Sequence, residues 1–439
     1  MRNTYFILPC LPAGMAFLLF LSQTTFGQSQ HCLADRYSQD ALFDSTDIQI
    51  TTGVHFATSM RWPGTQIDSL RMDIYLPDPN IDPAEKRPLI VMTHGGAFLA
   101  GDRTDMAPYA MEMARRGFVT ATISYRLDWE CAATDVFGPC ISCQSEAWRL
   151  KAAVYRAVQD NRAATRYLVH HADDLGIDTA FIFLQGESAG SITSLHAAFW
   201  DQTEAETFCS TCLDELGLLD TTGNDLTETF TIKGVINNCG GIANVNQGVM
   251  DGHNIPVIGF HTEWDCVVPY QSGPVLNCAP ANCGAFFWVT GSDYIRARLN
   301  QNGICSNMNR RLANLNHCDY PFGAIIGKSS CFLKNILCDN CTSSVTDQIW
   351  DIPDCAAGGT ISIQENEAES WVKLNGNRLI IEPNSKVSSV QVYDLSMRLL
   401  LDVAQSGSTV ELPTSLRGCM LVKIDAENRN SEVVKWCNF

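Results

Sequence analysis

The pentapeptide Gly186–Gly190, of the form Gly-x-Ser-x-Gly, is the feature that most limits how this chain can fold. It follows the apolar run Phe181–Gln185, predicted as a strand, and precedes Ser191–Trp200, predicted as a helix. A chain that turns sharply from strand to helix has no room for side chains two positions from the central residue, and glycine removes them. The pattern predicts an elbow that exposes the Ser188 hydroxyl, as a nucleophile, at the C-terminal edge of a sheet.

Apolar strand patterns alternate with helical patterns from Ile48 to Leu315. The later strand runs are continuously apolar, which is typical of strands buried on both faces of a mostly parallel sheet. The predicted strands are Leu70–Tyr75, Pro88–Met92, Phe118–Ser124, Phe181–Gln185, Ile232–Asn237, Pro256–Phe260 and, as the last one, Asn309–Leu315. Helices are predicted at Glu146–Ala172 and Ser292–Gln301. The fold class is therefore α/β, with a mostly parallel sheet flanked by helices over residues 28–350.

A second pattern begins near Asp351. Residues 351–365 contain Ala356–Thr360 and are predicted as a linker. Beyond them, short alternating strands are separated by turn signals. The predicted strands are Trp371–Leu374, Arg378–Glu382, Val387–Tyr393, Arg398–Val403 and Met420–Ile424. Residues 366–439 are thus predicted to form a small all-β sandwich module.

The N-terminus predicts export. In residues 1–27, Arg2 precedes the apolar run Ala16–Leu21, which is too short to span a bilayer. Thr25–Gly27 places small residues where a signal peptidase needs them. An uncleaved anchor is the competing interpretation. No other segment approaches transmembrane length, so we expect a secreted or cell-surface protein without an integral membrane segment in the mature chain.

The 19 cysteines agree with export, because many thiols in an exported chain are normally joined in disulfides. Removing Cys10 with the signal peptide leaves 18. Pairs with two-residue spacing are Cys140/Cys143, Cys209/Cys212 and Cys338/Cys341. Zinc is the competing interpretation, but no two of these pairs stand at ribbon or finger spacing. We expect no metal and no cofactor.

The net charge limits which classes of binding partner we expect. The formal net charge of −18 argues against nucleic acid and anionic membranes. The hydrophobic fraction of 46% is enough for a sizeable core.

A general base for Ser188 must be a histidine that comes later in the chain, after the acid. The candidates are His196, His253, His261 and His317. His196 lies two turns into the nucleophile's own helix and cannot turn back, and His261 ends the strand that should deliver the acid. His317 follows the last predicted strand and is the predicted base.

Asp265 is the predicted acid, because it lies in the segment after the strand Pro256–Phe260. It would fix the tautomer of His317 and stabilise its imidazolium form. Glu263 and Asp293 are weaker candidates.

An oxyanion hole needs preorganised N–H donors. We expect them to be the backbone amides of Ala189, at the start of a helix, and of Gly95 and Gly96, directly after the strand Pro88–Met92. His94 is expected to brace this loop rather than to act as a base.

These residues resemble the α/β-hydrolase superfamily and, within it, the carboxylesterases and hormone-sensitive-lipase-like esterases. His94–Phe98 is similar to their His-Gly-Gly-Gly-Phe loop, with Ala97 in place of the third glycine, and Gly186–Gly190 matches their Gly-Glu-Ser-Ala-Gly. Ser124–Leu127 and Asp160–Leu168 resemble further segments of that family. The resemblance covers about residues 48–320 and implies an ester hydrolase.

The C-terminal module resembles the sorting domain of the type IX secretion system. The matching segments are Val392–Leu395, Arg398, Leu412–Pro413 and Arg417–Gly418 before the strand Met420–Ile424. This resemblance implies outer-membrane secretion machinery as a partner, and then removal of the module or attachment at the surface.

Three functions follow. The first is an extracellular carboxylic ester hydrolase acting on a small-molecule or polymer-linked ester. The second is a serine peptidase of the prolyl-oligopeptidase type, whose Asp-x-x-Val-Pro segment is similar to Asp265–Pro269. The third is a non-catalytic surface or adhesion protein on a hydrolase scaffold. Polysaccharide-linked acetyl or feruloyl esters, lipids and polyesters all remain open as substrates.

A disulfide is also predicted between Cys266 and Cys318, because each directly follows one of the residues Asp265 and His317, which must meet. The alternative is that these thiols pair elsewhere, for example with Cys239.

Overall fold

The computed structural model describes most of the chain up to residue 355 and parts of the C-terminal module. The described residues are 31–32, 36–61, 65–127, 129, 143–243, 249–278, 286–312, 316–347 and 355, then 372–375, 378–381, 386–394, 399–403, 409–413, 415, 418–427 and 429–438. The predicted signal peptide at residues 1–27 lies outside them. So does the predicted linker at residues 351–365, apart from Cys355.

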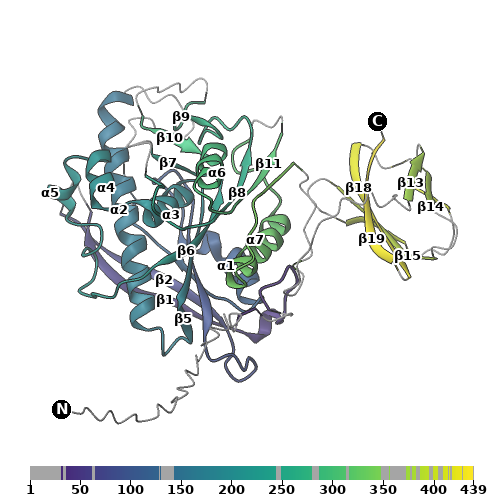
Figure 1. The fold of residues 1–439 in the computed structure, drawn as a ribbon, viewed down its shortest axis with the longest axis horizontal. Coiled ribbons are helices and arrows are strands. Elements are labelled where there is room, and N and C mark those ends of the chain that lie inside the picture. The colour runs from purple at the N-terminus through teal and green to yellow at the C-terminus, as the bar shows by residue number, and fades with distance from the viewer. Residues whose placement is uncertain are drawn as a thin grey trace, which may run out of the picture.

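A nine-stranded sheet forms the centre of the larger part (Figure 1). Its order is β1-β2-β4-β3-β5-β6-β8-β11-β12. The bounds are β1 Ile48–Met60, β2 Ile67–Pro77, β3 Arg87–Thr93, β4 Val119–Ile123, β5 Ile177–Glu187, β6 Ile232–Asn238, β8 Val257–Thr262, β11 Ser306–Arg311 and β12 Ser344–Thr346. From β4 to β12 all neighbouring strands are parallel, and only β1 and β2 join by antiparallel pairing.

Helices cover both faces of this sheet. Their bounds are α1 Ala107–Ala114, α2 Cys143–His170, α3 Ala189–Phe199, α4 Gln202–Phe208, α5 Cys212–Leu216, α6 Ser292–Gln301 and α7 Phe322–Leu337, with short 3-10 turns η1 Ser45–Asp47 and η2 Arg103–Met106. The apolar residues of α2, α3 and α6 belong to one core cluster, and those of α1 and α7 to another. Alternate residues of β3, such as Leu89 and Ile90, enter opposite clusters, as expected for a strand buried on both faces.

Smaller sheets complete the fold. Three short strands, β7 Gly241–Ala243, β9 Ser272–Pro274 and β10 Trp288–Gly291, pair antiparallel in the order β7-β10-β9. Near the C-terminus, β13 Val372–Asn375, β14 Arg378–Ile381 and β17 Thr409–Glu411 form one sheet, and β16 Leu399–Val403, β15 Lys386–Asp394, β18 Gly418–Glu427 and β19 Arg429–Asn438 form another. Among the described residues, no helix combines the length and apolar character that crossing a membrane requires.

This architecture is the α/β-hydrolase fold with a small all-β part at the C-terminus, so the predicted fold class is confirmed. Two predictions about the sheet are wrong in detail. The strand predicted at Asn309–Leu315 begins earlier and spans Ser306–Arg311. It is also not the last strand, because Ser344–Thr346 pairs beside it at the sheet edge. Both strands are polar and short, so hydrophobic patterning marks neither of them clearly.

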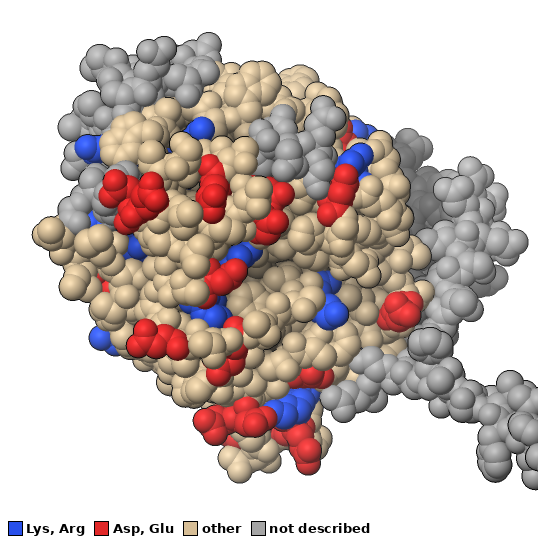
Figure 2. All heavy atoms as spheres, turned by 60° about the vertical axis from the view of Figure 1, so that its left-hand side comes forward, with Lys and Arg blue, Asp and Glu red and all other residues tan. Residues whose placement is uncertain are grey.

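Acidic side chains are spread over the face of the protein shown in Figure 2, with basic side chains placed among them. This distribution follows the excess of 48 Asp and Glu over 30 Lys and Arg. That face therefore offers no continuous basic surface of the kind that polyanions bind.

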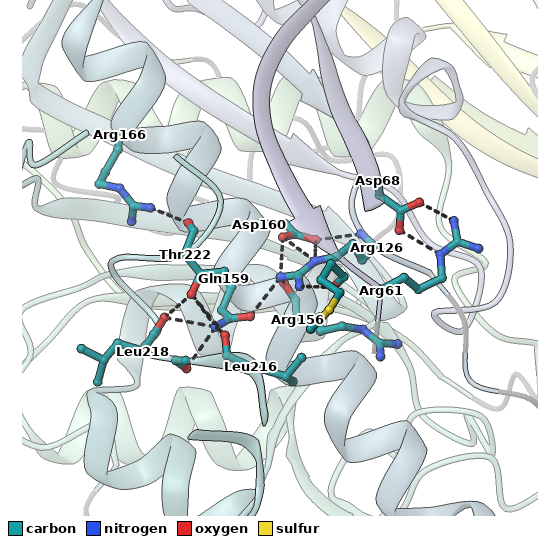
Figure 3. A network of polar contacts seen from close by, with 12 residues as sticks. Arg61, Asp68, Arg126, Arg156, Gln159, Asp160, Arg166, Leu216, Leu218 and Thr222 are labelled. Atoms are coloured by element: carbon teal, nitrogen blue, oxygen red, sulfur yellow. Dashed lines mark hydrogen bonds and ion pairs between the residues drawn. The ribbon is translucent and has the colours of Figure 1, made fainter. Parts of the chain in front are cut away.

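A buried polar network fixes the end of β4 against α2 (Figure 3). The Arg126 guanidinium donates to both carboxylate oxygens of Asp160 at 2.8–3.0 Å, and the Arg126 backbone N–H donates to Asp160 at 2.7 Å. Both side chains are at most 2% exposed. Gln159 accepts a further bond from Arg126 and donates to the carbonyls of Leu216 and Leu218. The segment Ser124–Leu127, which is matched by resemblance, directly follows β4 and therefore belongs to the scaffold.

Replacing Asp160 by Ala is expected to lower the free energy of unfolding by about 3–5 kcal/mol, because the Arg126 charge is left buried without its partner. Urea denaturation followed by intrinsic fluorescence measures this change. Asp173→Ala is the matched control, since Asp173 forms its ion pair with Lys86 on the surface and its side chain is 99% exposed. It should leave the urea midpoint unchanged. Equal effects of the two substitutions would contradict this account of the network.

Candidate active site

Ser188 lies at a strained turn between β5 and α3. Its backbone has φ 53° and ψ −117°, in a region that non-glycine residues rarely adopt. A Cβ on Gly186 would lie 2.2 Å from the carbonyl carbon of Gly190, and one on Gly190 would lie 2.0 Å from the Thr93 carbonyl oxygen. No side chain fits at either position. The elbow therefore requires glycine on both sides of Ser188, as the sequence pattern predicts.

The structure brings Ser188, His317 and Asp265 together. His317 Nε2 lies 2.7 Å from Ser188 Oγ, and His317 Nδ1 lies 2.6 Å from Asp265 Oδ2. Because a carboxylate only accepts, His317 carries its proton on Nδ1, and Nε2 accepts from the serine hydroxyl. This is the arrangement in which an imidazole takes a proton from a nucleophile.

Hydrogen bonds to the backbone fix the positions of both Asp265 and His317. Asp265 Oδ1 accepts from the backbone N–H groups of Val267, at 2.8 Å, and Val268, at 3.1 Å. The Thr262 hydroxyl, at the end of β8, donates to the carbonyl of Asn316, the residue before His317. The acid and the base are thus both anchored to the end of β8.

Electrostatics keep the Asp265 carboxylate ionised. Burial alone would raise its pKa, but hydrogen bonds from His261 and His317 outweigh burial and lower the pKa to about 2. Glu187 shows the opposite balance. Burial raises its pKa despite bonds from the Tyr109 hydroxyl at 3.3 Å and the Asn238 amide at 3.1 Å. Two carboxyl groups near His317 therefore differ in how readily they ionise.

The loop after β3 packs directly against the nucleophile. A Cβ on Gly95 would lie 3.4 Å from the Ser188 Cβ and 3.1 Å from the Glu187 carbonyl oxygen. Gly96 has φ 109°, and its Cβ would lie 2.1 Å from the Ala100 carbonyl oxygen. Ala97 has φ 54°, a conformation that glycine adopts without strain. The amide of Ala189, the other predicted donor, is the first of α3 and has no acceptor within the helix.

His94 braces this loop, as the sequence predicted. Its ring donates from Nδ1 to the Gly95 carbonyl at 2.7 Å and stacks on Tyr125 with centroids 4.4 Å apart. Burial lowers the pKa of His94, so the ring stays neutral. The Tyr125 hydroxyl and the Trp129 indole N–H donate to the carbonyls of His94 and Ala97.

A small apolar pocket opens beside Ser188. Among the described residues that line it, Ser188 is the only one with a polar side chain. The others are Ala97, Phe98, Leu150, Ala189, Ile192, Val267, Val268, Val275, Leu276 and Phe287. No local sequence pattern predicts this pocket, because its walls come from α2, α3 and the turns after β3 and β8, which lie far apart in the chain.

The weaker candidates lie elsewhere. Asp293 accepts hydrogen bonds from Arg296 and Tyr270. His196 is buried, donates to the Ile192 carbonyl and accepts from the Ala243 amide. Asp265, rather than Glu263 or Asp293, is the carboxylate bonded to His317. His261 contacts Asp265 instead of Ser188, an interaction that the sequence analysis missed although a histidine at the end of an apolar strand was a signal.

The predicted disulfide between Cys266 and Cys318 is wrong. Cys266 pairs with Cys278, because the turn after Asp265 runs beside residues 275–278, with Leu276 N–H donating to the Val267 carbonyl. Cys318 pairs with Cys239, the alternative partner, which lies directly after β6. The other disulfides among the described residues are Cys32–Cys338, Cys209–Cys212, Cys305–Cys341 and Cys331–Cys355.

The Cys239–Cys318 disulfide ties the base to the nucleophile's neighbour strand. Cys318 follows His317, and Cys239 follows Asn238, whose carbonyl accepts from the Ser188 N–H at 2.9 Å. The two sulfurs and a ring nitrogen of His317 lie within 4.8 Å of one another, a spacing that suits a metal ion. Because the sulfurs are bonded to each other, they are not thiolate ligands.

Comparison with known proteins places these features in context. The BD-FAE family model matches residues 72–138 and 146–249, which include the loop after β3 and the Ser188 elbow but neither Asp265 nor His317. No curated protein matches the chain.

Solved structures similar to this chain include several esterases. Esterase B from Lactobacillus rhamnosis is 15% identical, with 65% of this chain and 81% of that chain covered and a TM-score of 0.37. The esterase Est2 from Thermogutta terrifontis is 16% identical, with 62% and 86% covered and a TM-score of 0.37. A truncated carbohydrate esterase from gut microbiota is 16% identical, with 68% and 99% covered and a TM-score of 0.43.

Peptide mapping without reduction is expected to recover Cys239 linked to Cys318 and Cys266 linked to Cys278. Each pair has Cα atoms 5.0–5.1 Å apart, within the range that a disulfide requires. The reduced digest, which should release all four peptides separately, is the control. Recovery of Cys266 joined to Cys318 would contradict the arrangement of the two loops.

Proposed function

We propose that this protein is a serine carboxylic ester hydrolase that acts through a Ser188–His317–Asp265 triad and an acyl-enzyme intermediate. One observation carries the proposal. A serine on a strained elbow is hydrogen-bonded to a histidine, the histidine is hydrogen-bonded to a buried carboxylate, and the serine opens into an apolar pocket.

The reaction follows from these positions. Ser188 Oγ attacks the ester carbonyl carbon while His317 Nε2 takes the hydroxyl proton. The amides of Gly95, Gly96 and Ala189 stabilise the oxyanion of the tetrahedral intermediate. When that intermediate collapses, His317 returns the proton to the departing alkoxide, and the alcohol leaves. Water then attacks the acyl-enzyme with His317 again as base, which releases the carboxylic acid and restores Ser188.

Asp265 acts through His317. Its carboxylate holds the imidazole in the tautomer that accepts from Ser188 and stabilises the imidazolium that forms. With a pKa of about 2, Asp265 stays ionised at neutral pH.

The pocket favours an uncharged apolar acyl group. Of the wall residues that the structure describes, only Ser188 has a polar side chain, so a charged or hydroxylated acyl chain would lose hydrogen bonds to water that these walls do not replace. Isoleucine, leucine and phenylalanine side chains from α2, α3 and the β10 region narrow it. A small-molecule ester and an ester on a polymer remain equally compatible with this acyl pocket.

Export is the second part of the proposal. The six disulfides of the described residues support an oxidising compartment, because such bonds rarely persist in the cytosol. The proposed route begins with the signal peptide at residues 1–27. It continues through the outer-membrane machinery that would read the C-terminal module, and the mature protein is secreted or attached at the cell surface.

Replacing Ser188 by Ala is expected to lower kcat on p-nitrophenyl acetate by roughly 10⁴–10⁶-fold, because the nucleophile is lost while the amide donors remain. The rate of p-nitrophenol release, followed by absorbance at saturating substrate, measures kcat. Ser194→Ala is a matched control on the same helix. That hydroxyl donates to the Gln185 carbonyl and lies outside the triad. An unchanged rate in S188A would refute the proposal.

A substrate panel then separates ester hydrolysis from proteolysis. It contains p-nitrophenyl esters of increasing chain length, a feruloyl ester and a peptide amide. Hydrolysis of the esters but not of the amide is the expected result. Preferential cleavage of the amide would favour the prolyl-oligopeptidase type of function.

Intact-mass analysis of native secreted protein is expected to find a chain that begins near Gln28, because Thr25–Gly27 suits a signal peptidase. If the C-terminal module is removed, the measured mass should correspond to a chain that ends near residue 365. An unprocessed 439-residue chain in the cytosol would contradict export while leaving the esterase proposal intact.

A further inference from the structure

A chain of buried polar side chains continues beyond the triad acid. His261 ends β8, Ser292 begins α6, Asn237 lies on β6 and Ser191 on α3. None of these four residues is more than 3% exposed. Their atoms form consecutive hydrogen bonds. His261 Nδ1 lies 2.7 Å from Ser292 Oγ, Ser292 Oγ lies 2.9 Å from Asn237 Nδ2, and Asn237 Oδ1 lies 2.6 Å from Ser191 Oγ.

The other ring nitrogen of His261 faces the acid. His261 Nε2 lies 3.3 Å from Asp265 Oδ2, the same oxygen that binds His317, and 2.9 Å from the Val268 carbonyl oxygen. One carboxylate oxygen therefore faces two histidine rings, one of which belongs to the proposed triad. The Val268 carbonyl belongs to the turn whose N–H groups hold the other oxygen of Asp265.

The hydrogen bonds assign the proton on His261. A carboxylate and a carbonyl only accept, so Nε2 carries the hydrogen. Asn237 Oδ1 accepts from the Ser191 hydroxyl and from the Gly240 N–H at 2.9 Å, so Asn237 Nδ2 donates to Ser292 Oγ. The Ser292 hydroxyl then donates to His261 Nδ1 at 2.7 Å in preference to the Gly240 carbonyl at 3.5 Å. The result is a neutral ring whose orientation is fixed at both nitrogens.

We infer that His261 is a positioning residue for the reaction, which holds Asp265 and its turn so that the carboxylate points at His317. The inference rests on the proposed function. His261 touches neither Ser188 nor the pocket, and it acts through Asp265. Ser292 sets the orientation of the His261 ring, and Asn237 and Ser191 connect that orientation to the nucleophile helix, where the Ser191 N–H donates to the Ser188 carbonyl at 3.0 Å.

His261 affects Asp265 in two ways, by fixing its position and by stabilising its charge. Buried groups held by several hydrogen bonds keep one arrangement, and a shift of about 1 Å in a reacting group costs on the order of 10²-fold in rate. The N–H of His261 also stabilises the ionised form of Asp265. The titratable groups against the His261 ring are Asp265 and Tyr270, whose ring centroid lies 5.7 Å away.

The test compares two substitutions at His261. H261F keeps a ring but removes both polar contacts, and it is expected to lower kcat about 10–10²-fold with KM within about twofold, as losses of an orienting partner do. H261Q keeps an N–H that reaches Asp265, and it should recover kcat to within about threefold of the wild type. In H261F the acid limb of the kcat/KM profile should also move to higher pH, because the Asp265 carboxylate loses a donor and then stabilises the imidazolium form of His317 more strongly. A purely structural role would lower the profile without moving that limb.

S292A and H196Q complete the test. S292A leaves the His261 N–H in place but removes the hydroxyl that orients the ring, so a several-fold loss of kcat with a smaller shift of the acid limb than in H261F is expected. If H261F does not fold, S292A and H261Q carry the test. H196Q replaces another fully buried, hydrogen-bonded histidine, and it should lower the urea midpoint while kcat stays within about twofold of the wild type.

A second readout tests the role of His261 without depending on which ester is the natural substrate. An activated phosphonate labels an activated serine stoichiometrically, so its labelling rate is measured for each variant. Slower labelling of Ser188 in H261F, with recovery in H261Q, supports the inference whichever ester is the natural substrate. Wild-type values of kcat and labelling rate in H261F, or in S292A where H261F does not fold, would overturn it. A wild-type protein that is neither labelled nor active on any ester would instead refute the proposed function.

Discussion

The contact between the end of β3 and the elbow after β5 is the constraint on which the rest of the site depends. Gly190 packs so closely on the Thr93 carbonyl that no side chain fits between the two backbones, and a Cβ on Gly95 would be tight against the Glu187 carbonyl oxygen, at 3.1 Å. The left-handed conformation of Ser188 costs about 1–3 kcal/mol, and it persists only because the surroundings overdetermine it. The same contact places the nucleophile, the loop after β3 and the start of α3 within one short stretch of the sheet edge.

The parallel sheet then decides where the partners come from. Ser188, Cys239, Asp265 and His317 follow β5, β6, β8 and β11, which are consecutive neighbours in the sheet. With strands about 4.8 Å apart, β11 lies roughly 14 Å from β5, so the base loop must extend back over two strands to meet Ser188. The Thr262 hydroxyl holds that loop over β8, and the Cys239–Cys318 disulfide holds it over β6. The closure of this 79-residue separation adds about 4.5 kcal/mol in the chain-entropy account.

The parts of this arrangement that the sequence predicted are those with local signals. The glycines of the elbow, the apolar strands and the long helix α2 each follow from a few adjacent residues, and chain order restricts which histidine and which carboxylate can meet Ser188. The pocket and the contact of His261 with Asp265 involve residues far apart in the chain, and hydrophobic patterning carries no information about them. The Cys266–Cys318 pairing failed for a related reason. Meeting of two side chains does not bring the next residues together, because Cys266 faces residues 275–278 and Cys318 turns toward β6 at φ 53°.

The distribution of disulfides shows which half of the site needs them. Of the six among the described residues, five include a cysteine that follows β6. On the side of the nucleophile, the strands are buried on both faces, and α2 and α3 pack against them. This apolar packing holds Ser188 in place. The side that presents Asp265 and His317 ends in β11, a polar strand, and in β12, which has three residues. Short edge strands supply few backbone bonds and little apolar burial, so covalent links take over where packing is thin. The buried bonds of His261 supply the same restraint without a covalent link, at the strand between the two halves.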